Sequence, residues 1–175
     1  MNAFFDIDTQ IDFLFPAGAL YAPGAERLVP TIAKLNRYAV EHGIALISTV
    51  CAHPEDAEEF RVWPPHSVLG TIGQLKPAAT LVGEKQILFP KNELDPFSNP
   101  DLIPLLDSLG IEECTVYGVL TEHCVRHAAM GLLKTGRKVR LLTDAIHHLN
   151  ETAAREVIAG FQAAGGICET TGSLH

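Results

Sequence analysis

The most informative segment of the chain is Cys114-Thr115-Val116-Tyr117-Gly118-Val119-Leu120-Thr121-Glu122-His123-Cys124-Val125. Its first four residues form a β-branched and aromatic run that is typical of a buried strand. After it, apolar residues recur with the spacing of an amphipathic helix, at Val125, Ala128, Ala129 and Leu132. The segment therefore predicts a strand that leads through a short junction into a helix.

Cys124 lies at the start of this predicted helix. Thr121 is a good N-cap residue, which would put Cys124 in the first helical turn. Unpaired backbone N–H groups and the positive end of the helix dipole both favour a thiolate there. A nucleophilic cysteine is one interpretation, and a buried core cysteine, the usual fate of this residue type, is the other.

Outward from this segment, strand and helix patterns alternate along the chain. Strands are expected at 3–8, 44–49, 87–91, 138–142 and 167–170, and helices at 25–42 and 101–109 and from an N-cap near Asn150. This alternation predicts an α/β fold of three αβα layers, with an open, mostly parallel sheet of about six strands and helices on both faces. The length fits a single domain over residues 1–175.

Two further strands end in charged residues. Asp8 closes the apolar run that begins at Ala3, and Lys91 follows Ile87-Leu88-Phe89-Pro90. Read singly, Asp8 or Asp12 would cap a turn and Lys91 would be an ordinary solvated lysine. Read together with Cys124, the three follow separate strands, and a parallel sheet would bring them to one edge, where open α/β sheets bind ligands.

The sequences D-x-Q-x-D-F at 8–13 and G-x-x-T-x-x-C-V at 118–125 resemble those of the isochorismatase-like cysteine hydrolases, and within them most nearly the nicotinamidases and pyrazinamidases. The resemblance runs from Phe5 to about Ala145. It implies a catalytic triad of Asp8, Lys91 and Cys124. It also implies a cis peptide between Val119 and Leu120 and an oxyanion hole made by the backbone N–H groups of Leu120 and Cys124.

The alternation breaks between Cys51 and Lys85, in a stretch rich in Pro, Gly and charge, and long stretches of this kind usually serve a site. The resemblance makes it a metal site, in which His53 and His66 match, while Cys51 stands where the family has Asp and Glu59 where some members have His. Two imidazoles, a thiolate and a carboxylate suit Zn²⁺. The alternative is a metal-free loop with two solvated histidines.

The resemblance implies hydrolysis of a small primary amide through a thioester, with nicotinamide as the leading substrate. Trp63 and Phe13 would sandwich a planar ring and His123 would line the pocket, although both aromatic residues also fit as loop anchors. Other readings are another small amide or carbamoyl compound as substrate, a metal-water hydrolase in which Cys124 is structural, and a binding module without turnover.

The composition limits the classes of partner that we expect for this protein. The net charge of −8 argues against nucleic acid and anionic membranes, and no apolar run reaches the length of a membrane span. Neither a GxGxxG motif nor a P-loop occurs, so no nucleotide cofactor is expected. Four unpatterned cysteines and no signal peptide indicate a cytoplasmic protein. A small-molecule amide is the expected partner, and the resemblance allows a homo-oligomer. His42, His147, His148 and His175 are expected on the solvated surface.

Overall fold

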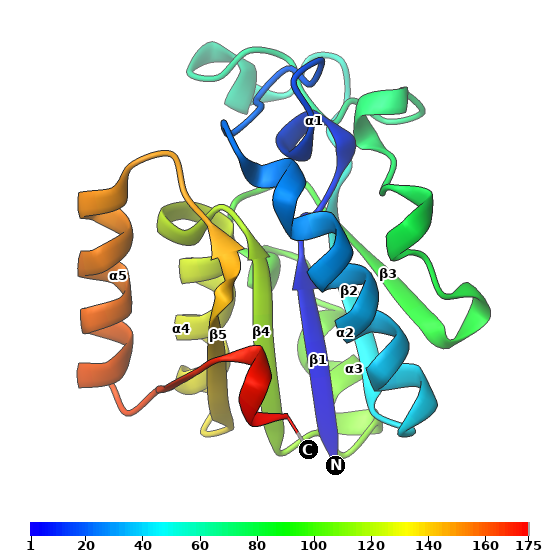
Figure 1. The fold of residues 1–175 in the computed structure, drawn as a ribbon. Helices are drawn as coiled ribbons and strands as arrows, with labels where there is room; N and C mark the ends of the chain where they lie inside the picture. Colours follow the sequence, from blue (N-terminus) through cyan, green and yellow to red (C-terminus); the bar gives the residue numbers. More distant parts are fainter. Residues whose placement is uncertain (175) are drawn as a thin grey trace.

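The computed structural model describes residues 1–174, and within them the strands form one parallel sheet (Figure 1). The strands are β1 (Asn2–Ile7), β2 (Ala45–Cys51), β3 (Gln86–Lys91), β4 (Glu113–Val119), β5 (Lys138–His147) and β6 (Ile167–Glu169). Their order in the sheet is β3-β2-β1-β4-β5-β6, and every neighbouring pair is parallel. The predicted sheet of six strands is confirmed.

Helices cover both faces of the sheet. They are α1 (Ile11–Leu14), α2 (Val29–Glu41), α3 (Leu102–Ser108), α4 (Arg126–Lys134) and α5 (Glu151–Ala163). Residues of α1 and α2 share one apolar cluster with Phe4 and Leu46, whereas residues of α3, α4 and α5 share the other with Phe5 and Ile47. Side chains alternate between the two faces along a strand, so each central strand contributes to both clusters. The three-layer prediction is therefore confirmed.

Several element boundaries differ from the predicted ones. The helix expected from residue 25 starts as a 3₁₀ turn (Ala25–Leu28) and becomes α-helical at Val29, one residue before Pro30, since proline suits the first turn of a helix. Strand β5 continues five residues beyond the expected end, as far as His147. Asn150 caps α5 as predicted, because its side chain accepts a hydrogen bond from the backbone N–H of Ala153.

The order of connection reverses between β1 and β4, the central neighbours of the sheet. Gly118 makes their close approach possible at the carboxyl edge: its φ is +121°, and a Cβ there would lie 2.2 Å from the carbonyl oxygen of Ile7. Ligand sites of open α/β sheets form at such a reversal.

The stretch that follows β2 runs over this same edge as a series of 3₁₀ turns, at Glu58–Arg61, Ile72–Gln74, Ala78–Thr80 and Gly83–Lys85. A buried ion pair ties it to the sheet, with Lys76 Nζ 2.8 Å from Asp6 Oδ2. Asn36 joins the pair to the turn beyond it by donating to Asp6 Oδ2 and to the carbonyl of Thr80. The stretch is therefore held in a defined position although it has no long regular element.

Within the described residues, none of the helices combines the length and the apolar character that crossing a bilayer requires.

Candidate active site

Asp8, Lys91 and Cys124 meet at the carboxyl edge of the sheet. Asp8 follows β1 directly, Lys91 is the last residue of β3, and Cys124 lies between β4 and α4. Lys91 Nζ is 2.8 Å from Asp8 Oδ2 and 3.6 Å from Cys124 Sγ. All three side chains are buried. The structure thus brings together the three residues that the sequence singled out.

Asp8 is held by its neighbours as an ionised carboxylate. Its φ of +46° is a left-handed conformation that Asp tolerates better than most residues, and it turns the chain out of β1. Thr49 Oγ1 donates to Asp8 Oδ1 at 2.7 Å. Burial raises the pKa of Asp8, but the Lys91 charge and hydrogen bonds from Cys124, Lys91 and Thr49 outweigh it, so the pKa lies below its ordinary value of 3.8.

Lys91 is correspondingly held as an ammonium. Besides Asp8, its Nζ donates to the carbonyl of Glu93 at 2.8 Å. Burial lowers the pKa of Lys91, yet the charges of Asp8 and of the nearby sulfur atoms raise it well above 10.5. The buried pair therefore consists of a carboxylate and an ammonium.

The protonation state of Cys124 differs from the thiolate that the sequence predicted. The side chain of Cys51, burial and the Asp8 charge raise the pKa of Cys124 well above its ordinary value, although Lys91 opposes them. The resting residue is a thiol, close enough to the ionised Asp8 to form a hydrogen bond with it.

Thr121 does not cap the helix, so that prediction was wrong. Residues Thr121–Val125 form a π-helical turn whose N-cap is Leu120, and His123 within it is non-helical (φ −119°, ψ −105°). The Thr121 hydroxyl donates to the carbonyl of His147 at 2.9 Å instead. The peptide bond between Val119 and Leu120 is cis, as the resemblance implied.

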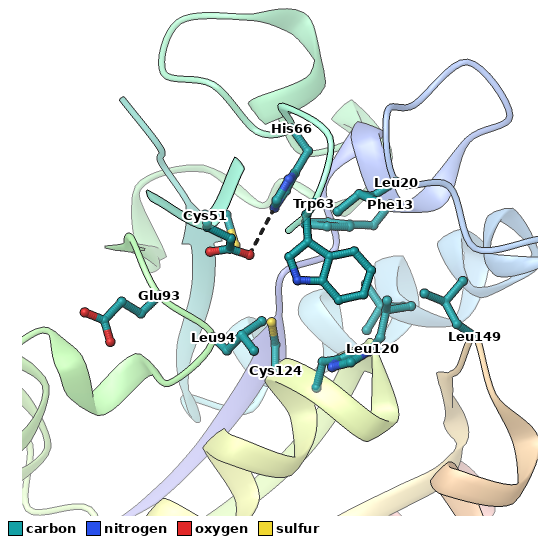
Figure 2. A pocket seen from close by; sticks show the side chains of 13 residues that line it. Phe13, Leu20, Cys51, Trp63, His66, Glu93, Leu94, Leu120, Cys124 and Leu149 are labelled. Carbon is teal, nitrogen blue, oxygen red and sulfur yellow. Dashed lines mark ion pairs between the residues drawn. The ribbon is translucent and has the colours of Figure 1, made fainter. Parts of the chain in front are cut away.

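An apolar pocket opens above Cys124 (Figure 2). The Cys124 sulfur points toward it from the turn that precedes α4. Trp63 and His123 meet edge to face with ring centroids 5.5 Å apart, and Phe13 packs likewise against His66 at 5.5 Å. The lining residues are Phe13, Leu20, Cys51, Glu59, Trp63, His66, Glu93, Leu94, Val119, Leu120, His123, Cys124 and Leu149.

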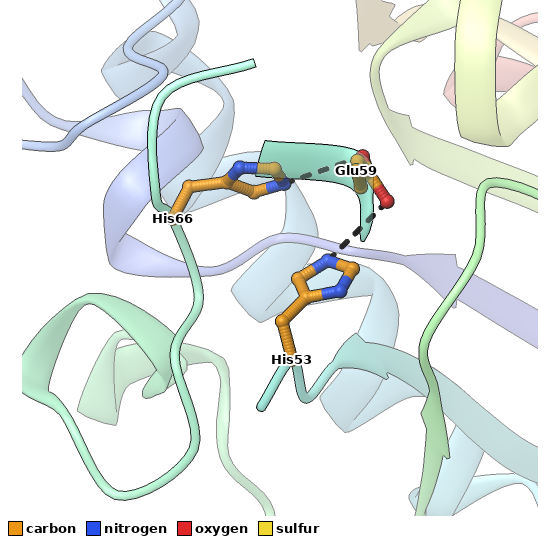
Figure 3. A group of neighbouring side chains, drawn as sticks. All are labelled: His53, Glu59 and His66. Carbon is orange, nitrogen blue, oxygen red and sulfur yellow. Dashed lines mark ion pairs between the residues drawn. The ribbon is translucent and has the colours of Figure 1, made fainter. Parts of the chain in front are cut away.

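His53, Glu59 and His66 form a group beside this pocket (Figure 3). The Glu59 carboxylate lies between the imidazoles, 3.7 Å from His53 Nε2 and 3.5 Å from His66 Nε2. One ligand atom from each residue lies within 4.8 Å of the others. His66 Nδ1 is 2.8 Å from the carbonyl of Pro64, which leaves Nε2 as the nitrogen with a free lone pair.

His53 has the properties of a metal ligand. It is fully buried, and neither ring nitrogen has a hydrogen-bond partner. Burial and then the neighbouring His66 lower the pKa of His53 to about 4, so the imidazole is neutral at ordinary pH. Buried polar atoms normally have partners, so an unpartnered Nε2 that faces the Glu59 carboxylate fits the binding of a divalent cation.

Cys51, the fourth predicted ligand, does not belong to this group. Lys91 Nζ donates to its sulfur at 3.3 Å, which places Cys51 with the first cluster. The reason is sheet register: Cys51 and Lys91 are Cα partners on the parallel strands β2 and β3, so their side chains lie on the same face.

Some residues of the site were missed from the sequence. Gln10 holds Cys51 from both sides, since its Nε2 donates to the Cys51 carbonyl at 2.8 Å and its Oε1 accepts from the Cys51 N–H at 2.7 Å. Its place in the 8–13 motif was the available signal. Thr49, which orients Asp8, is one of three threonines in the described strands and carries no such signal.

Four further histidines were expected on the solvated surface. His42 is exposed as expected, whereas His147 and His148 are half-buried, in contrast to the prediction, and His147 Nε2 lies 2.9 Å from the carbonyl of Pro23. His175 lies outside the described residues.

A thiol, a carboxylate and an ammonium thus meet at the carboxyl edge of a parallel sheet, below an apolar pocket, and this arrangement suits a hydrolase with a nucleophilic cysteine. Residues 2–173 match the isochorismatase domain, and the chain belongs to that family.

The comparisons also give individual similar proteins. The nicotinamidase/pyrazinamidase of Mycobacterium tuberculosis H37Rv is 27% identical over 160 residues, which cover 82% of this chain and 85% of that protein. The nicotinamidase of Escherichia coli K12 is 27% identical over 178 residues, 82% of each chain. A solved structure of the pyrazinamidase of Pyrococcus horikoshii in complex with zinc is 28% identical, with a TM-score of 0.92 and coverage of 97% and 98%.

Proposed function

We propose that the chain is a cysteine-dependent amidohydrolase that cleaves a small primary amide through a thioester, with nicotinamide as substrate and nicotinate and ammonia as products. The observation that carries the proposal is the cluster of Asp8, Lys91 and Cys124 below an aromatic pocket. The names of the similar enzymes from M. tuberculosis and E. coli support the substrate class.

Asp8 acts as the general base in this proposal. Cys124 is a thiol at rest and Asp8 is ionised, so the proton moves to the carboxylate as the sulfur attacks the amide carbonyl. Asp8 then returns the proton to the departing ammonia and activates the water that cleaves the thioester.

Lys91 makes this arrangement possible. A carboxylate beside a sulfur disfavours negative charge on the sulfur, and the Lys91 ammonium, 3.6 Å from Cys124 Sγ, offsets that effect. As the thiolate forms, the ammonium stabilises it while Asp8 is neutralised.

The oxyanion is assigned to the backbone N–H groups of Leu120 and Cys124. Leu120 directly precedes the π-helical turn that follows the cis peptide, and Cys124 lies within that turn. Removal of one such donor in other enzymes costs about 3 kcal/mol of transition-state stabilisation.

The pocket suits a flat ring. Trp63, His123 and Phe13 all line it together with the Cys124 sulfur, and an aromatic ring gains stacking or edge-to-face contacts from such walls. We assign these three residues to substrate binding.

His53, Glu59 and His66 would hold a divalent metal ion, with zinc preferred by the two imidazoles and the carboxylate. When bound, the ion supplies a Lewis acid beside the pocket, to which a heterocyclic nitrogen of the substrate could bind.

The cytoplasmic location stays a prediction.

The test is ammonia release from nicotinamide by purified protein, measured with and without prior iodoacetamide and with the Cys124→Ala variant. We expect release that both treatments abolish. Turnover that survives alkylation and Cys124→Ala would instead support hydrolysis by a metal-activated water. No release from nicotinamide, together with rapid labelling of Cys124, would reject this substrate and direct the search to other small amides.

A further inference from the structure

Two thiols share the Lys91 ammonium. Its Nζ lies 3.3 Å from Cys51 Sγ and 3.6 Å from Cys124 Sγ. Both cysteines line the pocket, so a small solute that reaches Cys124 also reaches Cys51. The other two cysteines, Cys114 in β4 and Cys168 in β6, are not among the residues that line it.

The proposed reaction leaves Cys51 without a task. Hydrolysis through a thioester needs one thiol, and the group of potential metal ligands does not include Cys51. An apolar or hydroxyl side chain would fill the same place at the end of β2. The position of the Cys51 sulfur beside the nucleophilic sulfur of Cys124 therefore needs a separate explanation.

The backbone fixes Cys51 in this position. Gln10 accepts from its N–H and donates to its carbonyl, and the β2–β3 register aligns it with Lys91. The sheet thus fixes the position of the Cys51 side chain, and the π-helical turn holds Cys124 close enough for a hydrogen bond between the two side chains. Disulfide formation requires such proximity between two thiols.

We infer that Cys51 is a resolving thiol, which forms an intramolecular disulfide with Cys124 when a peroxide oxidises the nucleophile. The inference rests on the proposed function only in taking Cys124 as the reactive sulfur. Its consequence is a reversible loss of activity in place of a permanent one.

The chemistry balances with one peroxide for each disulfide. The Cys124 sulfur attacks a peroxide oxygen; the S–O bond forms, the O–O bond breaks, and one water leaves after taking up the thiol proton, so Cys124 becomes a sulfenic acid. The Cys51 sulfur then attacks the Cys124 sulfur; the S–S bond forms, the S–O bond breaks, and the hydroxide leaves as a second water with the proton of Cys51. A dithiol reverses the product by exchange.

The adjacent ammonium assists both steps. A cation within 4 Å of a sulfur favours its thiolate form, which is the nucleophile in each attack. Without a resolving thiol, a sulfenic acid continues to sulfinic and sulfonic acids, which are not reduced by thiols. Cys51 therefore protects the nucleophile from permanent oxidation.

The experiment treats the purified, reduced protein with three equivalents of hydrogen peroxide, which suffice to carry one thiol to a sulfonic acid. Free thiols are then blocked with iodoacetamide, and the cysteines are mapped by non-reducing peptide mass spectrometry. Ammonia release from nicotinamide is followed in parallel, before and after dithiothreitol. Cys51→Ser is the test variant, and Cys168→Ser, a half-buried cysteine of β6, is the matched control.

We expect a linked peptide pair that contains Cys51 and Cys124, a mass loss of two hydrogen atoms and complete recovery with dithiothreitol. Cys51→Ser should instead accumulate Cys124 with two or three added oxygen atoms and recover nothing, and Cys168→Ser should match the wild type. The inference is overturned if wild-type Cys124 gains oxygen atoms while Cys51 remains a free thiol, or if the bond joins two chains.

The peptide map tests for the disulfide independently of the proposed amide hydrolysis. The disulfide is detected whether or not nicotinamide is hydrolysed, and it is read in the wild type even if Cys51→Ser does not fold. Amide turnover that survives Cys124→Ala would overturn the proposed function alone.

Discussion

Lys91 carries the charge balance of the site. It lies 2.8 Å from the Asp8 carboxylate and contacts the sulfur atoms of both Cys51 and Cys124. Without it, a buried carboxylate would stand beside a thiol that has to ionise. In the proposed mechanism, one ammonium thus lets the base Asp8 and the nucleophile Cys124 occupy the same apolar environment.

The first prediction concerns Lys91→Ala. We expect this variant to lose turnover of nicotinamide while it remains folded, with stability reduced by about 3–5 kcal/mol because Asp8 is left without its buried partner. Ammonia release measures the first effect, and circular dichroism with urea unfolding measures the second. Lys85→Ala, at an exposed lysine, is the control and should match the wild type. Near-normal activity of Lys91→Ala would remove Lys91 from the mechanism.

The second prediction concerns the metal group. His53→Ala should abolish stoichiometric zinc binding, because one of two imidazoles is lost from a set of three ligands. His42→Ala removes an exposed histidine and should bind zinc like the wild type. Zinc content is measured by elemental analysis after dialysis against the metal. Equal zinc content in both variants would place the metal elsewhere.

Some residues of the site could be predicted from the sequence and others could not. Asp8, Lys91 and Cys124 were found because each ends a strand or starts a helix, and a parallel sheet brings such positions together. The resemblance placed Cys51 among the metal ligands because it stands where the family has Asp, whereas the group of potential ligands in the structure is His53, Glu59 and His66. Only the pairing of β2 with β3 shows that Cys51 faces Lys91.

Among the elements, the junction from β4 to α4 determines the site most directly. It contains Gly118, the cis peptide bond after Val119 and the π-helical turn that presents Cys124. The strand and the helix were predicted from their residue patterns. The turn between them was not, because propensity and periodicity describe regular elements and carry no information on a π-helical turn or on the Thr121 contact to His147.

The third prediction tests this junction with Gly118→Ala and uses Gly160→Ala, a glycine of α5, for comparison. Gly118→Ala should lower stability by about 2–5 kcal/mol, because φ is +121° and the new Cβ would collide with the Ile7 carbonyl. Gly160→Ala should raise stability by about 0.5–1 kcal/mol, because Gly160 lies within α5 with no atom within 4 Å of the added carbon. Urea unfolding measures both. A Gly118→Ala protein as stable as the wild type would show that β1 and β4 need no glycine there.

At the scale of the whole molecule, the sheet carries two buried ion pairs among residues 1–174, Asp6 with Lys76 and Asp8 with Lys91. The first holds the long stretch after β2 over the carboxyl edge, and the second belongs to the site. The alternating pattern predicted the layers and the parallel sheet well, since each element buries one face. The course of residues 52–85 could not be predicted, because it depends on long-range polar contacts such as that of Lys76.

The fourth prediction concerns acid stability. The pKa of Asp8 is depressed in the folded protein, so the pair contributes stability above the ordinary value of 3.8 and loses it as the pH falls through the lower folded value. Each unit of depression corresponds to about 1.4 kcal/mol. Urea unfolding as a function of pH should show this loss in the wild type and not in the double variant Asp8→Asn/Lys91→Met. Identical pH dependence of the two proteins would contradict an ionised Asp8.

The most direct test of whether Cys124 attacks the amide carbon is to trap the thioester intermediate. Protein mixed with excess nicotinamide is quenched in acid within the first turnovers and measured by intact and peptide mass spectrometry. We expect a mass increase equal to nicotinamide less ammonia on the peptide that contains Cys124, and no such increase in Cys124→Ala. Ammonia release by unmodified enzyme, undiminished in Cys124→Ala, would contradict the thioester mechanism.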